Sequence, residues 1–149
     1  MAKKLVMSLS ITLPILYAGI LLGISFLATP IKFLVPSLTL PVALDIGMVT
    51  FHALIKLEWF LVFLHLIILW FNPLSKLVYT FVFIIIITLA AQTFLVIPTL
   101  DTRIILIQQG EFLKTSYCHL MYIASDIIKV ISLIGISYSS LGVLTAPSS

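Results

Sequence analysis

Four long apolar stretches follow one another along the chain, separated by short segments that carry proline, glycine or charged residues. A helix needs about 20 mostly apolar residues to cross a membrane, and each stretch is at least this long. The pattern therefore predicts four membrane-spanning helices, at residues 5–29, 42–71, 74–97 and 115–141. The predicted fold class is all-α: an integral membrane four-helix bundle that forms a single transmembrane domain over residues 1–149.

Prolines mark the predicted ends of two of these helices. Pro30 follows the first helix and opens a loop, residues 30–41, that is apolar enough to lie in the membrane interface. Pro98 is predicted to end the third helix or to kink it, because proline lacks the N–H that an α-helix needs. The amphipathic segment that begins at Asp101 is predicted to be a helical extension or an interfacial helix ending at Gly110.

Composition narrows the class of protein further. Hydrophobic residues make up 62% of the chain and charged residues 9%, whereas soluble domains carry about 25% charged residues. The lipid bilayer is therefore the expected surrounding, and the scattered net charge of +3 forms no basic stripe for nucleic acid. Motifs typical of hydrolases, zinc proteases and phosphate-binding loops are missing from the sequence, so it does not indicate an enzyme.

The start of the chain bears on its orientation. Lys3 and Lys4 precede the first apolar stretch, which is too long for the apolar part of a signal peptide. Positive residues favour the cytoplasmic side of a membrane. We therefore expect a multi-pass membrane protein with both termini in the cytoplasm.

A short motif recurs in the two halves of the chain. FLATP at residues 26–30 resembles FLVIP at residues 94–98, and each is followed 21 or 22 positions later by a histidine, His52 or His119. An acidic residue follows each histidine. The spacing suggests two helix-hairpin repeats of parallel topology, related by an axis along the membrane normal as in some transporters; chance similarity between apolar segments is the alternative.

Ionisable side chains inside the predicted helices are the strongest functional signal, because charge inside a membrane is costly and usually faces the interior of the bundle. Counting along the helices at 1.5 Å per residue places Glu58 and Asp126 about 20–23 Å from the inner ends. The sequence thus predicts an intramembrane polar cluster near the outer side. Its expected members are Asp45, His52, Lys56, Glu58, Asp101, Arg103, His119, Tyr122, Asp126 and Lys129.

The direction of these side chains can be estimated at 100° per residue. The fourth helix carries one polar stripe, from His119 to Lys129, whereas the second helix carries two, one with Lys56 and one with Glu58. An interior charge network follows if the single stripe meets either of the other two. Polar residues of the third segment could complete it: Gln92, Asp101 and Arg103. The structural alternative is a set of ion pairs that only fixes helix packing.

Three functions remain open. The first is a small proton- or ion-coupled transporter that uses the buried carboxylates and histidines. The second is a haem- or metal-binding redox protein in which His52 and His119 are the ligands of a haem b or a metal ion. The third is a non-catalytic accessory or assembly subunit. Cys118 is either a small packed residue or a metal-ligand partner of His119, and its redox role is open.

Several stretches resemble a known kind of protein. They are ATPIKF-x-x-PSLTLPVALD (28–45), FHALIKLE (51–58) and IPTLDTRI followed by H-x-x-Y-x-x-x-D-x-x-K (97–129). These resemble small four-helix inner-membrane proteins of bacteria, and the likeness covers most of the chain. The resemblance implies the fold but no activity. A homodimer or a larger membrane complex is also expected, because four helices form a thin bundle around a polar site.

Overall fold

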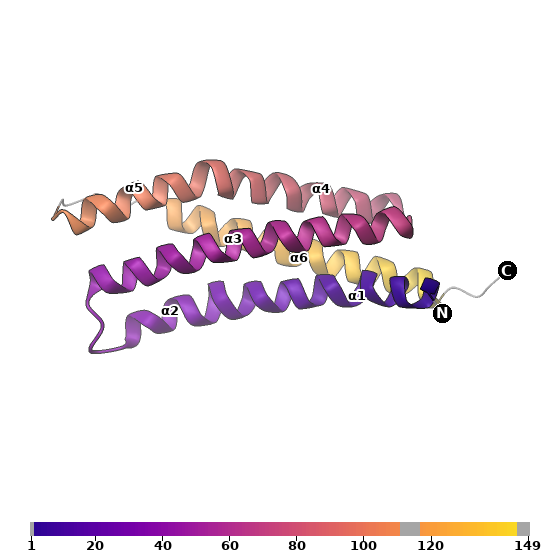
Figure 1. The fold of residues 1–149 in the computed structure, drawn as a ribbon, viewed down its shortest axis with the longest axis horizontal. Helices are drawn as coiled ribbons and strands as arrows, with labels where there is room; N and C mark the ends of the chain where they lie inside the picture. The colour runs from indigo at the N-terminus through magenta and orange to yellow at the C-terminus, as the bar shows by residue number, and fades with distance from the viewer. Residues whose placement is uncertain (1, 111–116, 146–149) are drawn as a thin grey trace.

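The chain folds into four long helical rods that lie side by side (Figure 1). The computed structural model describes the backbone of residues 2–110 and 117–145 and the side chains of residues 5–110 and 117–142. The first rod comprises α1 (Ala2–Leu21), the π-helical η1 (Leu22–Ala28), α2 (Thr29–Ile31) and the 3-10 turn η2 (Lys32–Leu34). The others are α3 (Leu40–Phe71); α4 (Lys76–Ala91), π-helical η3 (Gln92–Val96) and α5 (Ile97–Gln108); and α6 (Cys118–Thr145).

Four helical stretches are long and apolar enough to cross a membrane: Leu5–Leu34, Leu40–Phe71, Lys76–Gln108 and Cys118–Gly142. Large apolar side chains on the outside of the bundle, such as Trp70 with 84% of its surface exposed, would be unfavourable in water. The predicted all-α four-helix bundle is confirmed, and the chain is a multi-pass membrane protein. The predicted start of the fourth helix at Thr115 lies outside the described residues.

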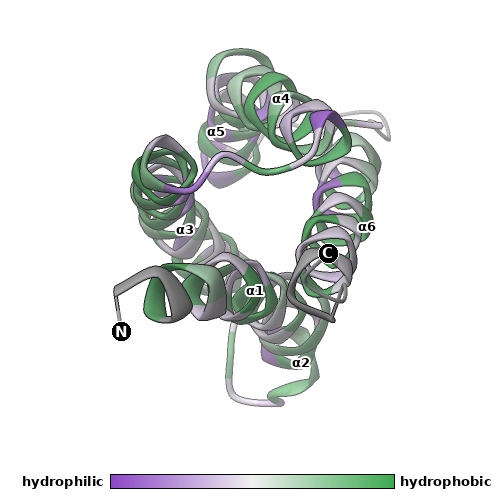
Figure 2. Ribbon diagram, turned by 90° about the vertical axis from the view of Figure 1, so that its right-hand side faces the viewer, coloured by the Kyte–Doolittle hydropathy of each residue, from purple (hydrophilic) through white to green (hydrophobic). Residues whose placement is uncertain are grey.

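The rods surround one common axis (Figure 2). α1 packs against α3 and α6, and α4 also packs against α3 and α6, so α3 and α6 lie diagonally opposite each other. Small residues permit the closest approaches: a Cβ added at Gly135 on α6 would lie 2.6 Å from Cε2 of Phe81 on α4. On the other side of α6, the Ser137 hydroxyl donates a hydrogen bond to the Ile11 carbonyl of α1 (3.2 Å).

Neither Pro30 nor Pro98 ends its helix, contrary to the prediction for Pro30. The first rod continues to Leu34 and the third to Gln108. A π-helical turn precedes each proline and is closed by the residue just before it, where Thr29 N–H donates to Ile24 O and Ile97 N–H donates to Gln92 O. Such wider turns let a membrane helix accommodate a proline. The segment beyond Pro98 is a helical extension of the third span. This was one of the two predictions for that segment, the other being a separate interfacial helix.

The two halves of the chain therefore share a local structure as well as a motif. Glu58 and Asp126 each follow their proline by 28 positions, and their helices, α3 and α6, are the diagonal pair. A two-fold axis along the bundle would exchange the first rod with the third and α3 with α6. This is the arrangement that a duplicated helix hairpin would produce, although the duplication itself stays a prediction.

Candidate functional site in the bundle interior

Polar side chains from all four rods meet inside the bundle. They are Tyr17 of α1, Glu58 of α3, Gln92 of η3, and Asp126 and Lys129 of α6. Glu58, Gln92, Asp126 and Lys129 have no exposed surface, and Tyr17 is 3% exposed. We call these five residues the central cluster. A group of this polarity is stable in such surroundings only when its members satisfy one another.

The ammonium of Lys129 is the hub of the central cluster. Its Nζ is paired with Oε2 of Glu58, donates to Oε1 of Gln92 at 2.6 Å and lies 3.0 Å from Oδ1 of Asp126. An ammonium has three N–H donors, so each of them has an acceptor. The pair with Glu58 crosses the bundle diagonally and thereby links α3 to α6.

The acceptor side of the central cluster is less complete. Oε2 of Glu58 accepts a second hydrogen bond from the Tyr17 hydroxyl (2.6 Å), and Oδ1 of Asp126 accepts one from Nε2 of Gln92 (2.9 Å). The second oxygens, Glu58 Oε1 and Asp126 Oδ2, are buried and have no hydrogen-bond partner within the described part of the chain. Two carboxylates share one ammonium. The cluster is therefore neutral with one added proton and carries a charge of −1 without it.

The central cluster lies near the middle of α3 and of the third span, and its depth in the membrane stays a prediction. In α3, 18 residues precede Glu58 and 13 follow it. Gln92 stands at the middle of the third span, Lys76–Gln108.

Three other residues of the predicted site form separate contacts at the distal end of the bundle. By the distal end we mean the end opposite the start of α1. His52 Nε2 of α3 lies 2.7 Å from Asp101 Oδ2 of α5, and their side chains are 46% and 23% exposed. Asp45 Oδ1 accepts a hydrogen bond from Nε2 of Gln108 (2.6 Å). Both contacts tie α3 to α5 at the surface.

Three further predicted residues also lie away from the central cluster. Lys56 is exposed on α3, with no hydrogen bond or ion pair to any described side chain. Arg103 and His119 line a cavity at the distal end. Of the two alternatives that the sequence offered for α3, the polar stripe of α6 therefore meets Glu58 and not Lys56, and of the three residues of the third segment only Gln92 joins the network.

Two aromatic residues border the central cluster, and the sequence interpretation included only one of them. Tyr122 is 1% exposed, and its backbone carbonyl accepts from Nε2 of Gln92 (3.2 Å). Tyr17 was missed because it stands in an apolar run. A phenol hydroxyl needs a partner when it is buried, and this requirement was the available signal.

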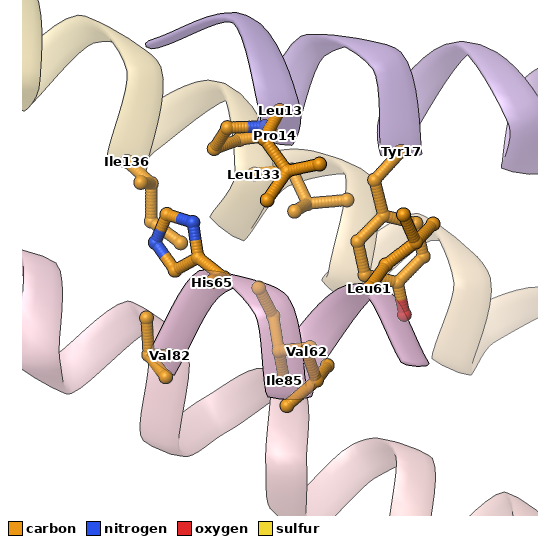
Figure 3. A pocket seen from close by; sticks show the side chains of 10 residues that line it. All are labelled: Leu13, Pro14, Tyr17, Leu61, Val62, His65, Val82, Ile85, Leu133 and Ile136. Atoms are coloured by element: carbon orange, nitrogen blue, oxygen red, sulfur yellow. The ribbon is translucent and has the colours of Figure 1, made fainter. Parts of the chain in front are cut away.

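A small, mostly apolar cavity lies next to Tyr17 (Figure 3). It has a volume of about 10 Å³ and is lined by Leu, Val and Ile side chains together with Pro14, Tyr17 and His65. His65 is 7% exposed, and neither of its ring nitrogens has a partner in the described residues. The volume is close to the least that a water molecule needs. Tyr17 lies between this cavity and Glu58.

The proposed metal and haem ligands are not supported by a wider ligand set. Across residues 5–110 and 117–142, no group of three or more His, Cys, Asp or Glu side chains could hold a metal ion. Nε2 of His52 is already engaged by Asp101, and His119 lines the distal cavity. Coordination of haem b or a metal by His52 and His119 stays a prediction, as does any redox role for the half-buried Cys118.

Comparisons of the chain with protein-family models, curated proteins and solved structures find no match. The resemblance to small bacterial inner-membrane proteins therefore stays a prediction. The functional argument rests on the geometry alone.

Proposed function

We propose that this protein is a small proton-coupled membrane transporter and that the central cluster is its proton-binding site. One observation carries the proposal: two fully buried carboxylates, Glu58 and Asp126, share the single ammonium of Lys129. A buried net charge is costly. Binding one proton removes it, and the two carboxylate oxygens without hydrogen bonds are the positions where that proton fits.

A proton at this site would change how the helices are held together. With Glu58 ionised, Lys129 ties α6 to α3 across the bundle axis. With Glu58 protonated, the attraction between them falls, and Lys129 keeps Asp126 on its own helix and Gln92 on η3. The two protonation states thus favour different packing of α3 against α6. A difference of this kind is what couples ion binding to a conformational change.

Transport also requires that protons reach the cluster. On the side of the termini, the small cavity with His65 leads to Tyr17, whose hydroxyl donates to Glu58. On the distal side, Tyr122 lies next to the cluster and stacks on Phe51, with ring centroids 4.4 Å apart. Phe51 in turn lines the distal cavity. We infer that protons reach the cluster past Tyr17 on one side and past Phe51 and Tyr122 on the other.

The test is proton uptake by proteoliposomes that contain a pH-sensitive dye and are driven by a membrane potential. Glu58→Gln and Asp126→Asn each remove one proton-accepting carboxylate and leave a neutral ion pair with Lys129, so we expect folded proteins whose flux is at least about tenfold lower. Lys56→Gln is the matched control, because Lys56 is an exposed charge on the same helix. Its flux should equal that of the wild type.

Infrared difference spectra between acidic and neutral buffer test the proton site itself. A protonated carboxyl band should appear in the wild type and should be lost in Glu58→Gln or Asp126→Asn, but kept in Asp45→Asn. Wild-type flux equal to that of protein-free vesicles, or undiminished flux in both carboxylate variants, would show that the cluster only fixes helix packing. The accessory-subunit interpretation would then replace this proposal.

A further inference from the structure

A second site lies at the distal end of the bundle, apart from the central cluster. It is a cavity of about 340 Å³ between the end of the first rod, α3, α5 and the start of α6. Small-molecule sites in proteins have volumes of about 300–1,000 Å³. Most of the lining is Leu, Ile and Phe. Among the described residues, the ionisable ones that line it are Lys32, Arg103 and His119, which are all basic types and come from three different elements.

Lys32 is the residue most directly placed for binding. Its Nζ lies 5.0 Å from the ring centroid of Phe33 and 5.6 Å from that of Phe51. No carboxylate of the described residues pairs with it. Aromatic faces attract a cation but accept no conventional hydrogen bond, so the ammonium keeps its donors available inside an apolar cavity.

Gly47 on α3 makes room for this ammonium. A Cβ at position 47 would overlap Nζ of Lys32, although it would meet only the flexible end of that side chain. The missing side chain therefore lets the charge enter the cavity instead of lying outside the bundle. Lysine at the end of a membrane helix usually extends toward water, so its position here calls for an explanation.

We propose that the distal cavity binds a small organic anion with an apolar body. Its acid group would bind the ammonium of Lys32 through charge-assisted hydrogen bonds. The apolar body would lie against the side chains of Leu44, Leu100 and Ile104. The anionic group has two possible sources, a free single-chain acid or the headgroup of a membrane phospholipid. The volume fits the free acid, to which the proposal commits.

Phe51 connects this site to the central cluster. Phe51 lines the cavity, and its ring packs on that of Tyr122, whose backbone carbonyl accepts a hydrogen bond from Gln92. If the proposed transport function holds, the organic anion is the co-transported substrate and the pair of rings separates it from the proton. Anion binding can nevertheless be measured directly, without measuring proton flux.

The experiment uses octanoate labelled with ¹³C at the carboxyl carbon and the full chain in nanodiscs of zwitterionic lipid. NMR titration should show saturable binding to the wild type. Lys32→Gln should weaken it by at least about tenfold, as loss of a charge-assisted hydrogen bond would. The matched control Lys56→Gln should bind as the wild type does, and octanol should not compete. Octanoate binding is measured without any proton flux, so its failure can be told apart from a failure of the proposed function.

A second variant guards against misfolding of Lys32→Gln. Gly47→Ala keeps every charge but displaces the ammonium, and it should weaken octanoate binding while the helical circular dichroism stays unchanged. Equal binding by wild type and Lys32→Gln, or competition by octanol as strong as by octanoate, would overturn the proposal. So would an anionic phospholipid that stays bound at one molecule per protein and that octanoate cannot displace, since the site would then hold a lipid headgroup.

Discussion

Two contacts of this protein each join an acidic side chain to a basic one, and their surroundings differ. In the central cluster, Glu58 and Lys129 are paired with no exposed surface, whereas the distal pair of His52 and Asp101 lies at 2.7 Å with side chains 46% and 23% exposed. Exposed pairs contribute about 0–1 kcal/mol to stability, but removing one partner of a buried pair costs about 3–5 kcal/mol. Burial, not distance, therefore separates the two regions. Three predictions test this difference.

The largest effect is expected for Lys129→Met. It removes the only cation of the central cluster and leaves Glu58 and Asp126 buried without a counter-charge. We expect a loss of about 3–5 kcal/mol in the free energy of unfolding, measured by titrating the protein in mild detergent with a denaturing detergent. Adding Glu58→Gln and Asp126→Asn to Lys129→Met should restore much of the loss. A single variant as stable as the wild type would mean that the cluster is not held by charge.

An intermediate effect is expected for Tyr17→Phe. The Tyr17 hydroxyl donates to Oε2 of Glu58 at 2.6 Å inside the bundle, and a hydrogen bond to a charged group contributes about 1.5–3 kcal/mol. The same titration should show a loss of this size. Tyr138→Phe is the control, because Tyr138 is 80% exposed on α6 and should change stability little. Equal losses in the two variants would contradict a specific role for Tyr17.

The smallest effect is expected for the distal pair. A double-mutant cycle with His52→Ala and Asp101→Asn should give a coupling energy below about 1 kcal/mol. The coupling should fall further as salt is added, because exposed charges are screened. A coupling energy close to the loss of about 3–5 kcal/mol expected for Lys129→Met would contradict this prediction. It would show that the distal end is shielded from solvent, for example by a second copy of the chain.

The sequence alone predicts the helices well and the site in part. Long apolar runs determine four spans, and the stripe that contains Asp126 and Lys129 is visible at helical spacing. The choice between Lys56 and Glu58 as the inward residue of α3 is not visible, because lipid-facing and inward-facing positions of a membrane helix are both apolar. Tyr17 is missed for the same reason. The diagonal placement of α3 and α6 depends on contacts between residues far apart in the chain, which no local pattern records.

The continuation of the first helix through Pro30 was not predicted, and at Pro98 it was one of two alternatives, since proline ends most helices in water. In a membrane the freed backbone groups still need partners, and one extra residue in the turn provides them. The hydroxyl of Thr29, for example, donates to the carbonyl of Ile24 at 2.8 Å. A proline inside an apolar run thus usually ends a helix in water, whereas in a membrane the helix can continue past it.

The π-helical turn of the third rod affects how α5 is rotated about the helix axis relative to α4. An α-helix advances about 100° per residue, so the one residue that a π turn adds shifts the angular phase of everything beyond it. Packing in the interior of the bundle fixes the orientation of α4 and Gln92. The directions of the Asp101 and Arg103 side chains on α5 depend in addition on the angle that the π turn introduces. Deleting one residue between Gln92 and Val96 would rotate α5 by about a quarter turn without moving α4. The rod thus works as two independently oriented segments on one backbone.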